Sequence, residues 1–237
     1  MEIDFDSLLH AATYYLSYQR KIGREVMISE SLLKFPVADY LTGAGTKIGQ
    51  IELEFPHPKL VDRYIDLVKI KEGSNKELIF AIEFKIAKPA TKDSSEKKRI
   101  FYDLMRLFLL TEKGTKGYFM IVGEFNHFIS YFKSTPIAKD KAIKEKKEQN
   151  QKIPERKSFY NEWFNFAKDI PQVFKVDKAE KKSYQTFYDS FIEVYQPRMN
   201  HSHKLPEKLT TKCIAISKLN RGNPVPYIGG VWEILAT

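Results

Sequence analysis

Cysteine, histidine and long apolar runs are scarce in this chain, and each scarcity argues against a class of protein. The only cysteine among the 237 residues is Cys213, so no disulfide can form within the chain and a reducing compartment is expected. With one cysteine and five histidines, a Cys/His zinc site is not expected. No apolar run approaches the ~20 residues of a transmembrane helix, and the N-terminus is acidic, unlike a signal or transit peptide. We therefore expect a cytoplasmic protein that does not enter a membrane.

Positive charge is in excess, which favours a polyanionic partner such as nucleic acid. The formal net charge is +9 and the isoelectric point is about 9.3. Contacts with phosphates would make such binding sensitive to salt. Much of the excess lies in residues 138–157, which hold eight Lys or Arg and four acidic residues. We interpret this run as a solvated linker or an exposed helix, and a basic arm that follows a nucleic-acid backbone is the alternative.

Two nearby segments place charged side chains inside runs that are otherwise typical of strands. Residues 60–70 and 78–87 are rich in β-branched and aromatic residues. Asp66 interrupts the first run, and Glu83 and Lys85 interrupt the second. Because ionised side chains are rarely buried without partners, these three residues mark a candidate site. An exposed hairpin carrying a surface salt-bridge ladder is the alternative, but apolar residues on both faces of the second run indicate a buried strand.

The spacing predicts an antiparallel hairpin that brings the three residues together. The polar stretch 71–76 contains Gly, Ser and Asn and is typical of a turn. Folding about this turn places Ile82 or Glu83 opposite Asp66, with opposed Cβ atoms roughly 4.5–5.5 Å apart. Glu83 and Lys85 are two residues apart and share a face of their strand. Asp66 joins them only if the register is right, because a one-residue slip would turn it to the other face.

Two neighbouring carboxylates beside an ammonium suit metal-assisted chemistry on a phosphodiester. Carboxylates that lie close together repel each other, and a divalent cation removes that conflict. Mg²⁺ keeps several waters and is commonly held by one or two carboxylates together with substrate phosphates, and Mn²⁺ is a substitute. Lys85 can position or deprotonate the attacking water, or stabilise charge on a phosphate. The predicted chemistry is therefore metal-dependent phosphodiester hydrolysis.

The order Asp66, then Glu83-Phe84-Lys85, resembles the signature of the PD-(D/E)XK nuclease superfamily, which has the restriction-endonuclease-like fold. The resemblance covers about residues 25–125 and implies an α/β core of helix, three-stranded meander, helix and strand, in which helices flank a mixed sheet. No Pro directly precedes Asp66, which departs from the signature at a position that is loose in the family. The elements expected here are helices at 29–42 and 94–110 and strands at 48–55, 60–70, 78–87 and 117–122.

The resemblance also implies which residues act. It makes Asp66, Glu83 and a carboxylate of the first helix both metal ligands and catalytic residues, and it adds Lys85 as a catalytic residue. Glu30 is our choice for the helix carboxylate, and Glu25 is the alternative.

The helix after the second charged strand carries further candidates. Lys97, Lys98 and Arg99 lie in its first turns and are predicted to bind nucleic acid through phosphates beside the metal, with a solvated helix end as the alternative. Asp103 and Arg106 are three residues apart and are expected to pair. His57, between two prolines, is expected on a surface loop, and contact with the substrate is the alternative.

Three parts of the chain are expected: a nuclease-like core at 1–130, a basic Lys/Glu-rich linker or exposed helix at 131–157, and a C-terminal α+β extension at 158–237, packed on the core. In the extension, aromatic residues at helical spacing over 159–170 and 184–195 predict buried faces rather than base-stacking platforms. Residues 212–218 and 225–235 predict two strands that extend the sheet.

The predicted activity is that of a Mg²⁺-dependent nuclease, with DNA favoured over RNA, acting in restriction, repair or phage defence by analogy with the superfamily. A homodimer would suit paired cuts in duplex DNA. A non-catalytic nucleic-acid-binding module on the same fold is the main alternative, and an α/β protein with a coincidental motif is the third. Paired acids favour cleavage, because a pure binder would not need them facing an anionic ligand.

Overall fold

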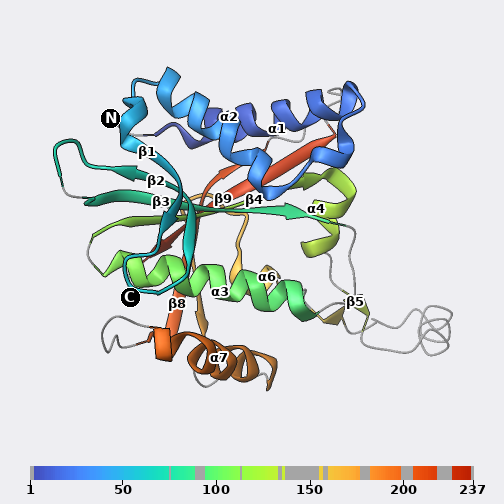
Figure 1. The fold of residues 1–237 in the computed structure, drawn as a ribbon. Coiled ribbons are helices and arrows are strands. Elements are labelled where there is room, and N and C mark those ends of the chain that lie inside the picture. The colour runs from blue at the N-terminus through green and yellow to red at the C-terminus, as the bar shows by residue number, and fades with distance from the viewer. Residues whose placement is uncertain are drawn as a thin grey trace, which may run out of the picture.

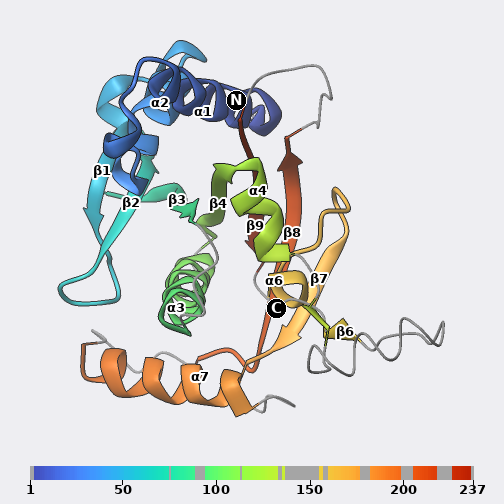
Figure 2. The ribbon, with the colours of Figure 1, turned by 90° about the vertical axis from the view of Figure 1, so that its right-hand side faces the viewer.

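The computed structural model describes residues 3–74, 76–88, 94–112, 114–132, 135–136, 155–156, 160–176, 182–198, 205–217 and 226–235, which form one large sheet with flanking helices. The helices α1 and α2 cover one face of the sheet (Figure 1). On the other face lie α3 and then α7, which is farther from the sheet in both views (Figure 1, Figure 2). The predicted α/β class is confirmed. In the part of the chain so described, no helix is long and apolar enough to cross a membrane.

The N-terminal layer is formed by α1 (Phe5–Lys21) and α2 (Glu30–Gly43), which are joined through the 3₁₀ turn η1 (Glu25–Met27). Asp4 caps the start of α1, because its Oδ1 accepts a hydrogen bond of 3.1 Å from Ser7 N. The buried residues of α1 recur at helical spacing, so one stripe of the helix packs on the sheet.

A meander follows, formed by β1 (Ile51–Pro56), β2 (Tyr64–Ile70) and β3 (Leu78–Ala87), each antiparallel to the next. Then α3 (Ser94–Thr111) crosses one face, and β4 (Lys116–Glu124) returns parallel to β3. A parallel return requires such a crossover, because the chain must first travel back along the sheet.

Two of the expected strands begin later than predicted. The turn η2 (Ile48–Gln50) precedes β1, so that strand starts at Ile51. The second strand starts at Tyr64 rather than residue 60, because the chain turns at Asp62, whose φ of 56° is not compatible with an extended strand. In both cases, apolar residues that precede the strand extend the predicted range beyond the strand itself.

The C-terminal part completes the sheet. Here β9 (Tyr227–Leu235) pairs with β4, β8 (Lys208–Ile216) pairs with β9, and β7 (Pro171–Lys175) pairs with β8. The strand order is therefore β1-β2-β3-β4-β9-β8-β7, and β3–β4 is the parallel pair. The remaining elements are α4 (Phe125–Phe132), β5 (Thr135–Pro136), β6 (Glu155–Arg156), α6 (Tyr160–Trp163), α7 (Lys182–Tyr195) and η3 (Gln196–Arg198).

Both C-terminal strands expected from the sequence are present in the sheet, whereas the division into three parts stays a prediction. The basic run 138–157 lies outside the described residues apart from β6. The helical stripe expected over 159–170 is wrong, because α6 ends at Trp163 and Ile170 is exposed.

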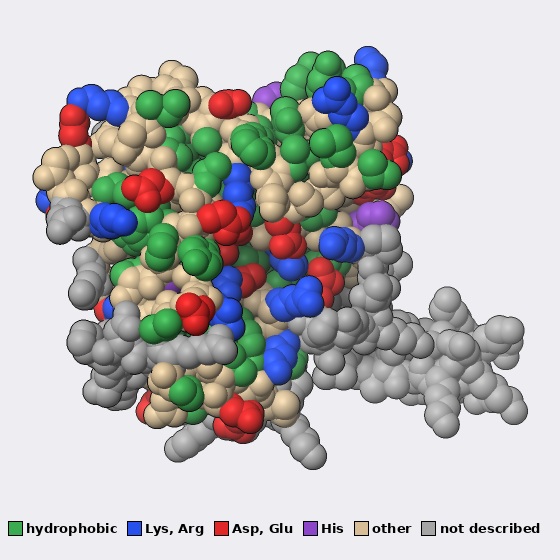
Figure 3. Space-filling model, viewed as in Figure 1, with side chains coloured by type: hydrophobic (Ala, Val, Ile, Leu, Met, Phe, Trp, Pro, Cys, Tyr) green, Lys and Arg blue, Asp and Glu red, His purple; other side chains and the backbone are tan. Residues whose placement is uncertain are grey.

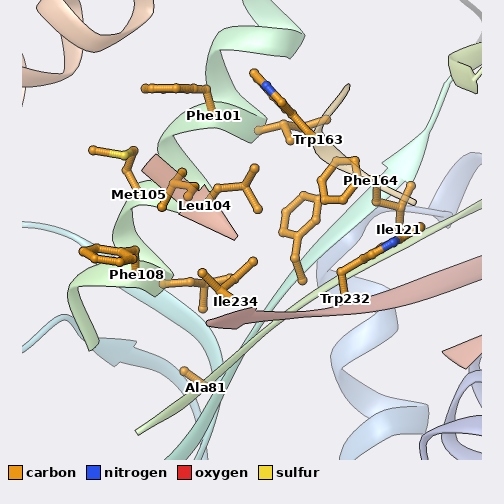
Figure 4. Packing of buried hydrophobic residues seen from close by; sticks show 14 of the residues in the cluster. Ala81, Phe101, Leu104, Met105, Phe108, Ile121, Trp163, Phe164, Trp232 and Ile234 are labelled. Carbon is orange, nitrogen blue, oxygen red and sulfur yellow. The ribbon is translucent and has the colours of Figure 1, made fainter. Parts of the chain in front are cut away.

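Two hydrophobic cores lie on opposite faces of the sheet. The core under α1 and α2 includes alternate residues of β3, among them Ile82 and Phe84. The core under α3 is aromatic-rich: Figure 4 shows Phe101 of α3 beside Trp163, and Phe164 beside Trp232 of β9. The ring centroids of these pairs are 5.7 and 4.8 Å apart. The predicted buried face of 184–195 is confirmed, since Phe187, Phe191 and Tyr195 of α7 are buried in this core.

Candidate active site

The strands β2 and β3 part at the point where the charged residues begin. Their ladder runs from Ile70–Leu78 to Leu67–Ile82 and ends there, although β3 continues to Ala87. Continuing the same register places Asp66 opposite Glu83, which is one of the two arrangements that the sequence left open. Beyond the last pair, Asp66 Oδ2 accepts a hydrogen bond of 2.9 Å from Phe84 N. A side chain of β2 therefore binds a backbone N–H group of β3. We call this opening between the two strands the fork.

Glu83 and Lys85 project from β3 on the side opposite to Ile82 and Phe84, as the alternation of a strand requires. Both are buried, with 4% and 6% of their surface exposed. They therefore do not belong to an exposed hairpin, and β3 lies inside the sheet between β2 and β4. The surface salt-bridge ladder considered as an alternative is excluded by this burial.

Helix α3 supplies the partner of Glu83. Arg106 Nη2 lies 3.1 Å from Glu83 Oε1 and also contacts Asp103, so the expected Asp103–Arg106 pair is confirmed. The pair is part of the site rather than a surface contact, because both side chains are largely buried. The phenol group of Tyr195, at the end of α7, also acts to raise the pKa of Arg106.

Helix α2 supplies two further groups. Glu30 Oε1, at the start of the helix, lies 2.8 Å from Lys85 Nζ. Lys34 Nζ lies 2.9 Å from Asp66 Oδ1 and also forms an ion pair with Glu54 of β1. Thus the helix contacts both charged strands of the hairpin.

Glu25, the alternative helix carboxylate, forms an ion pair with Arg20 at 3.2 Å instead. It belongs to the short turn η1 before α2 and is largely exposed. Between the two candidates, the structure brings Glu30 to the fork.

Among the described residues, the cluster contains more acid than base. Five carboxyl groups meet three cationic groups, namely Glu30, Glu54, Asp66, Glu83 and Asp103 against Lys34, Lys85 and Arg106. Figure 3 shows acidic and basic side chains gathered across the middle of the face of the molecule seen in Figure 1, between the α1/α2 layer and α3.

Burial and like charge govern protonation in the cluster. Burial raises the pKa of Glu83 well above its ordinary value, Arg106 opposes the rise, and the carboxyl groups of Asp103 and Asp66 add to it. Burial also raises the pKa of Asp103 to about 6, against the lowering effect of Arg106 and Lys85. Burial acts to lower the pKa of Lys34, but its ion pairs with Glu54 and Asp66 outweigh this and the pKa rises. An additional cation would therefore relieve repulsion among the acids.

Asp66 and Glu83 are the pair that fits a divalent cation. The carboxyl group of Asp66 raises the pKa of Glu83, so the two groups lie close enough to repel each other when both are ionised. Within the described ranges, no group of three or more His, Cys, Asp or Glu side chains is arranged to hold a metal ion. Two carboxylates completed by water and substrate phosphate form a usual Mg²⁺ shell, so this donor pair fits Mg²⁺.

The predicted phosphate-binding residues lie on α3 before the cluster. Arg99 is exposed and precedes Asp103 by one turn, so the two share a face of the helix. Lys98 is half-buried, with its Nζ 5.5 Å from the centre of the Tyr102 ring. Lys97 is half-buried as well. Their contact with phosphates stays a prediction.

Sequence reasoning misplaced one residue and gave no role to several others. His57 was expected on the surface but is 4% exposed, because its Nε2 lies 3.1 Å from the backbone oxygen of Arg106 and its ring packs below α3. The clearest missed group is Lys34, a lysine within the apolar sequence Leu32-Leu33-Lys34-Phe35. A cation in such a run was a signal of the same kind as the charges in β3.

Comparisons with known proteins identify no relative of this chain. No family model, no curated protein and no solved structure matches this chain.

Proposed function

We propose that this chain is a metal-dependent nuclease that hydrolyses phosphodiester bonds in nucleic acid. One observation carries the proposal: Asp66 lies opposite Glu83 at the fork, and Lys85 follows on the same face of β3. Burying charged groups is costly unless they are paired, and clusters of such groups with raised pKa values gather at functional sites. Mg²⁺ is the proposed cofactor, and Mn²⁺ is its proposed substitute.

The order of elements supports a restriction-endonuclease-like core for this proposal. A helix, an antiparallel meander, a crossover helix and a strand parallel to the last meander strand follow one another as α2, β1–β3, α3 and β4. This is the order that the PD-(D/E)XK resemblance implies, and the three signature residues lie on the two strands where that family carries them.

Each residue of the fork would have a distinct task. Asp66 and Glu83 would hold the metal, with Glu30 close to it; when bound, Mg²⁺ supplies charge neutralisation and activation of water. Phe84 N orients the carboxylate of Asp66, and Arg106 orients that of Glu83. Lys85, held by Glu30, is placed to position the attacking water or to stabilise charge on the phosphate.

The substrate is proposed to be DNA rather than RNA, bound along α3 through Lys97, Lys98 and Arg99. The net positive charge of +9 supports a polyanionic ligand. We further propose a cytoplasmic protein that acts in restriction, repair or phage defence, as a homodimer where both strands of a duplex are cut.

A non-catalytic nucleic-acid-binding module is the second candidate. It is favoured by the ion pairs of the cluster, since every one of its carboxylates already contacts an ammonium or guanidinium group of the chain. Such pairing can neutralise the acids without any metal.

Cleavage assays decide between the two candidates. The purified protein would be incubated with labelled duplex DNA, single-stranded DNA and RNA, in Mg²⁺, Mn²⁺ or EDTA, beside a Glu83→Gln/Lys85→Met double variant. Metal-dependent cutting that disappears in the double variant would establish the nuclease and its substrate. Equal binding by both proteins without cutting would establish the binding module. A Glu77→Gln variant provides the matched control, because this exposed glutamate precedes the other end of β3.

A further inference from the structure

The contacts of Lys34 suggest control of the metal site. Its ammonium group is buried, with 5% of the side chain exposed, and it lies between Asp66 Oδ1 and the carboxylate of Glu54. The contact with Asp66, at 2.9 Å, engages one of the two carboxylates that we assign to the metal. A lysine in this place both occupies a ligand oxygen and repels a second positive charge.

The position of Glu54 indicates that this arrangement is built into the fold. Glu54 stands opposite Asp66 in the β1–β2 register, between the pairs Leu53–Leu67 and Phe55–Ile65. Its φ of 51° lies in the left-handed region, which is rare for a non-glycine residue and costs free energy. The strand therefore departs from regular geometry at the residue that reaches Lys34.

We infer that Lys34 sets the affinity of the site for its divalent cation, because it competes with the cation for Asp66. When the cation displaces Lys34 from Asp66, Lys34 keeps its ion pair with Glu54. This inference rests on the proposed nuclease function. Losing Asp66 alone would leave a buried ammonium group unpaired, which is costly. Glu54, whose side chain is 61% exposed, removes that cost because it contacts the same ammonium group.

Binding of Mn²⁺ alone, followed by electron paramagnetic resonance of the free ion, tests the inference on the full chain. Lys34→Met should bind Mn²⁺ about tenfold more tightly, because the competing charge is gone. Glu54→Gln should bind it several-fold more weakly, because Lys34 then has Asp66 as its main partner. Lys34→Arg keeps the charge and should remain close to the wild type. In the double variant Lys34→Met/Glu54→Gln the effect of Glu54 should vanish, since it acts through Lys34.

Lys59→Met is the matched control, because Lys59 is equally buried and pairs with Glu112. It should lose stability without a change in Mn²⁺ affinity. Should Lys34→Met fail to fold, Glu54→Gln alters an exposed side chain and still tests the direction. The inference would be overturned by unchanged Mn²⁺ affinity in both single variants, or by a double variant that binds Mn²⁺ more weakly than Lys34→Met. Metal-dependent cutting by the wild type would still support the proposed nuclease function in that case. A wild type and a Lys34→Met variant that neither bind Mn²⁺ nor cut would overturn both.

Discussion

The two halves of β3 differ although they belong to one strand. From Phe80 to Ile82 the strand is paired on both sides, with β2 and with β4. From Glu83 to Ala87 the ladder with β4 continues, but the ladder with β2 has ended. In the second half, the backbone donor Phe84 N therefore binds the carboxylate of Asp66. A charged site can thus be placed in the middle of a sheet when one neighbouring strand departs and the other stays.

The largest expected effect is on catalysis in the open half. Glu83→Gln removes a proposed metal ligand but keeps the shape of the side chain, so the proposed cleavage in Mg²⁺ should slow about 10³-fold. The measurement is a single-turnover assay with the substrate found in the cleavage screen. Glu77→Gln should leave the rate unchanged. Cleavage by Glu83→Gln at the wild-type rate would show that the open half is not catalytic.

The paired half should respond in stability instead. Ile82 is fully buried under the N-terminal helices, and Ile82→Ala leaves a cavity that should cost about 3 kcal/mol of unfolding free energy. Urea denaturation followed by circular dichroism measures this loss. The affinity for Mn²⁺ should stay within a factor of about two, because the ion pairs at the fork are not touched. A large change in Mn²⁺ affinity would mean that the two halves are not separable.

Protonation provides a test that distinguishes the charged cluster from the rest. The pKa of Asp103 is raised to about 6 from 3.8, so the folded protein binds more protons than the unfolded chain between these values. Its contribution to stability is therefore fully present at low pH and is lost as the pH rises through this window. Asp103→Asn should remove that loss, on the order of 1 kcal/mol, in urea denaturation with EDTA across about pH 4 to 7. An unchanged pH profile in Asp103→Asn would contradict the assignment.

The smallest effect is expected at the turn of the hairpin. Lys71 and Glu77 form an exposed ion pair of 3.0 Å there, in contrast to the buried pairs at the fork. Lys71→Ala should change the unfolding free energy by less than about 0.5 kcal/mol, because water and salt screen the pair. Thermal melting at low and high salt measures it. A loss comparable to that of Ile82→Ala would show that the turn, rather than the apolar ladder, holds the hairpin together.

Several features of the fold could be predicted because their causes are local. The limits of β3 and α3 follow from apolar periodicity and polar turns, and the predicted range of β3 agrees with the structure. Charges within apolar strands also distinguish Asp66, Glu83 and Lys85 in the sequence alone. Boundaries next to irregular backbone were predicted less well, as at Asp62, because nothing in a short window indicates a left-handed turn.

The sequence by itself determined the alternation of elements and the residues whose charge is out of place, since both depend on neighbours along the chain. Only the tertiary structure decided the register of Asp66 against Glu83 and the partners Lys34, Glu54 and Arg106. It also decided that His57 is buried below α3. These contacts join residues that are far apart in sequence, and a one-residue change in strand register or a different helix position would replace every one of them. Burial then raises the energetic cost of leaving any of these charges unpaired, which makes their partners a property of the whole fold.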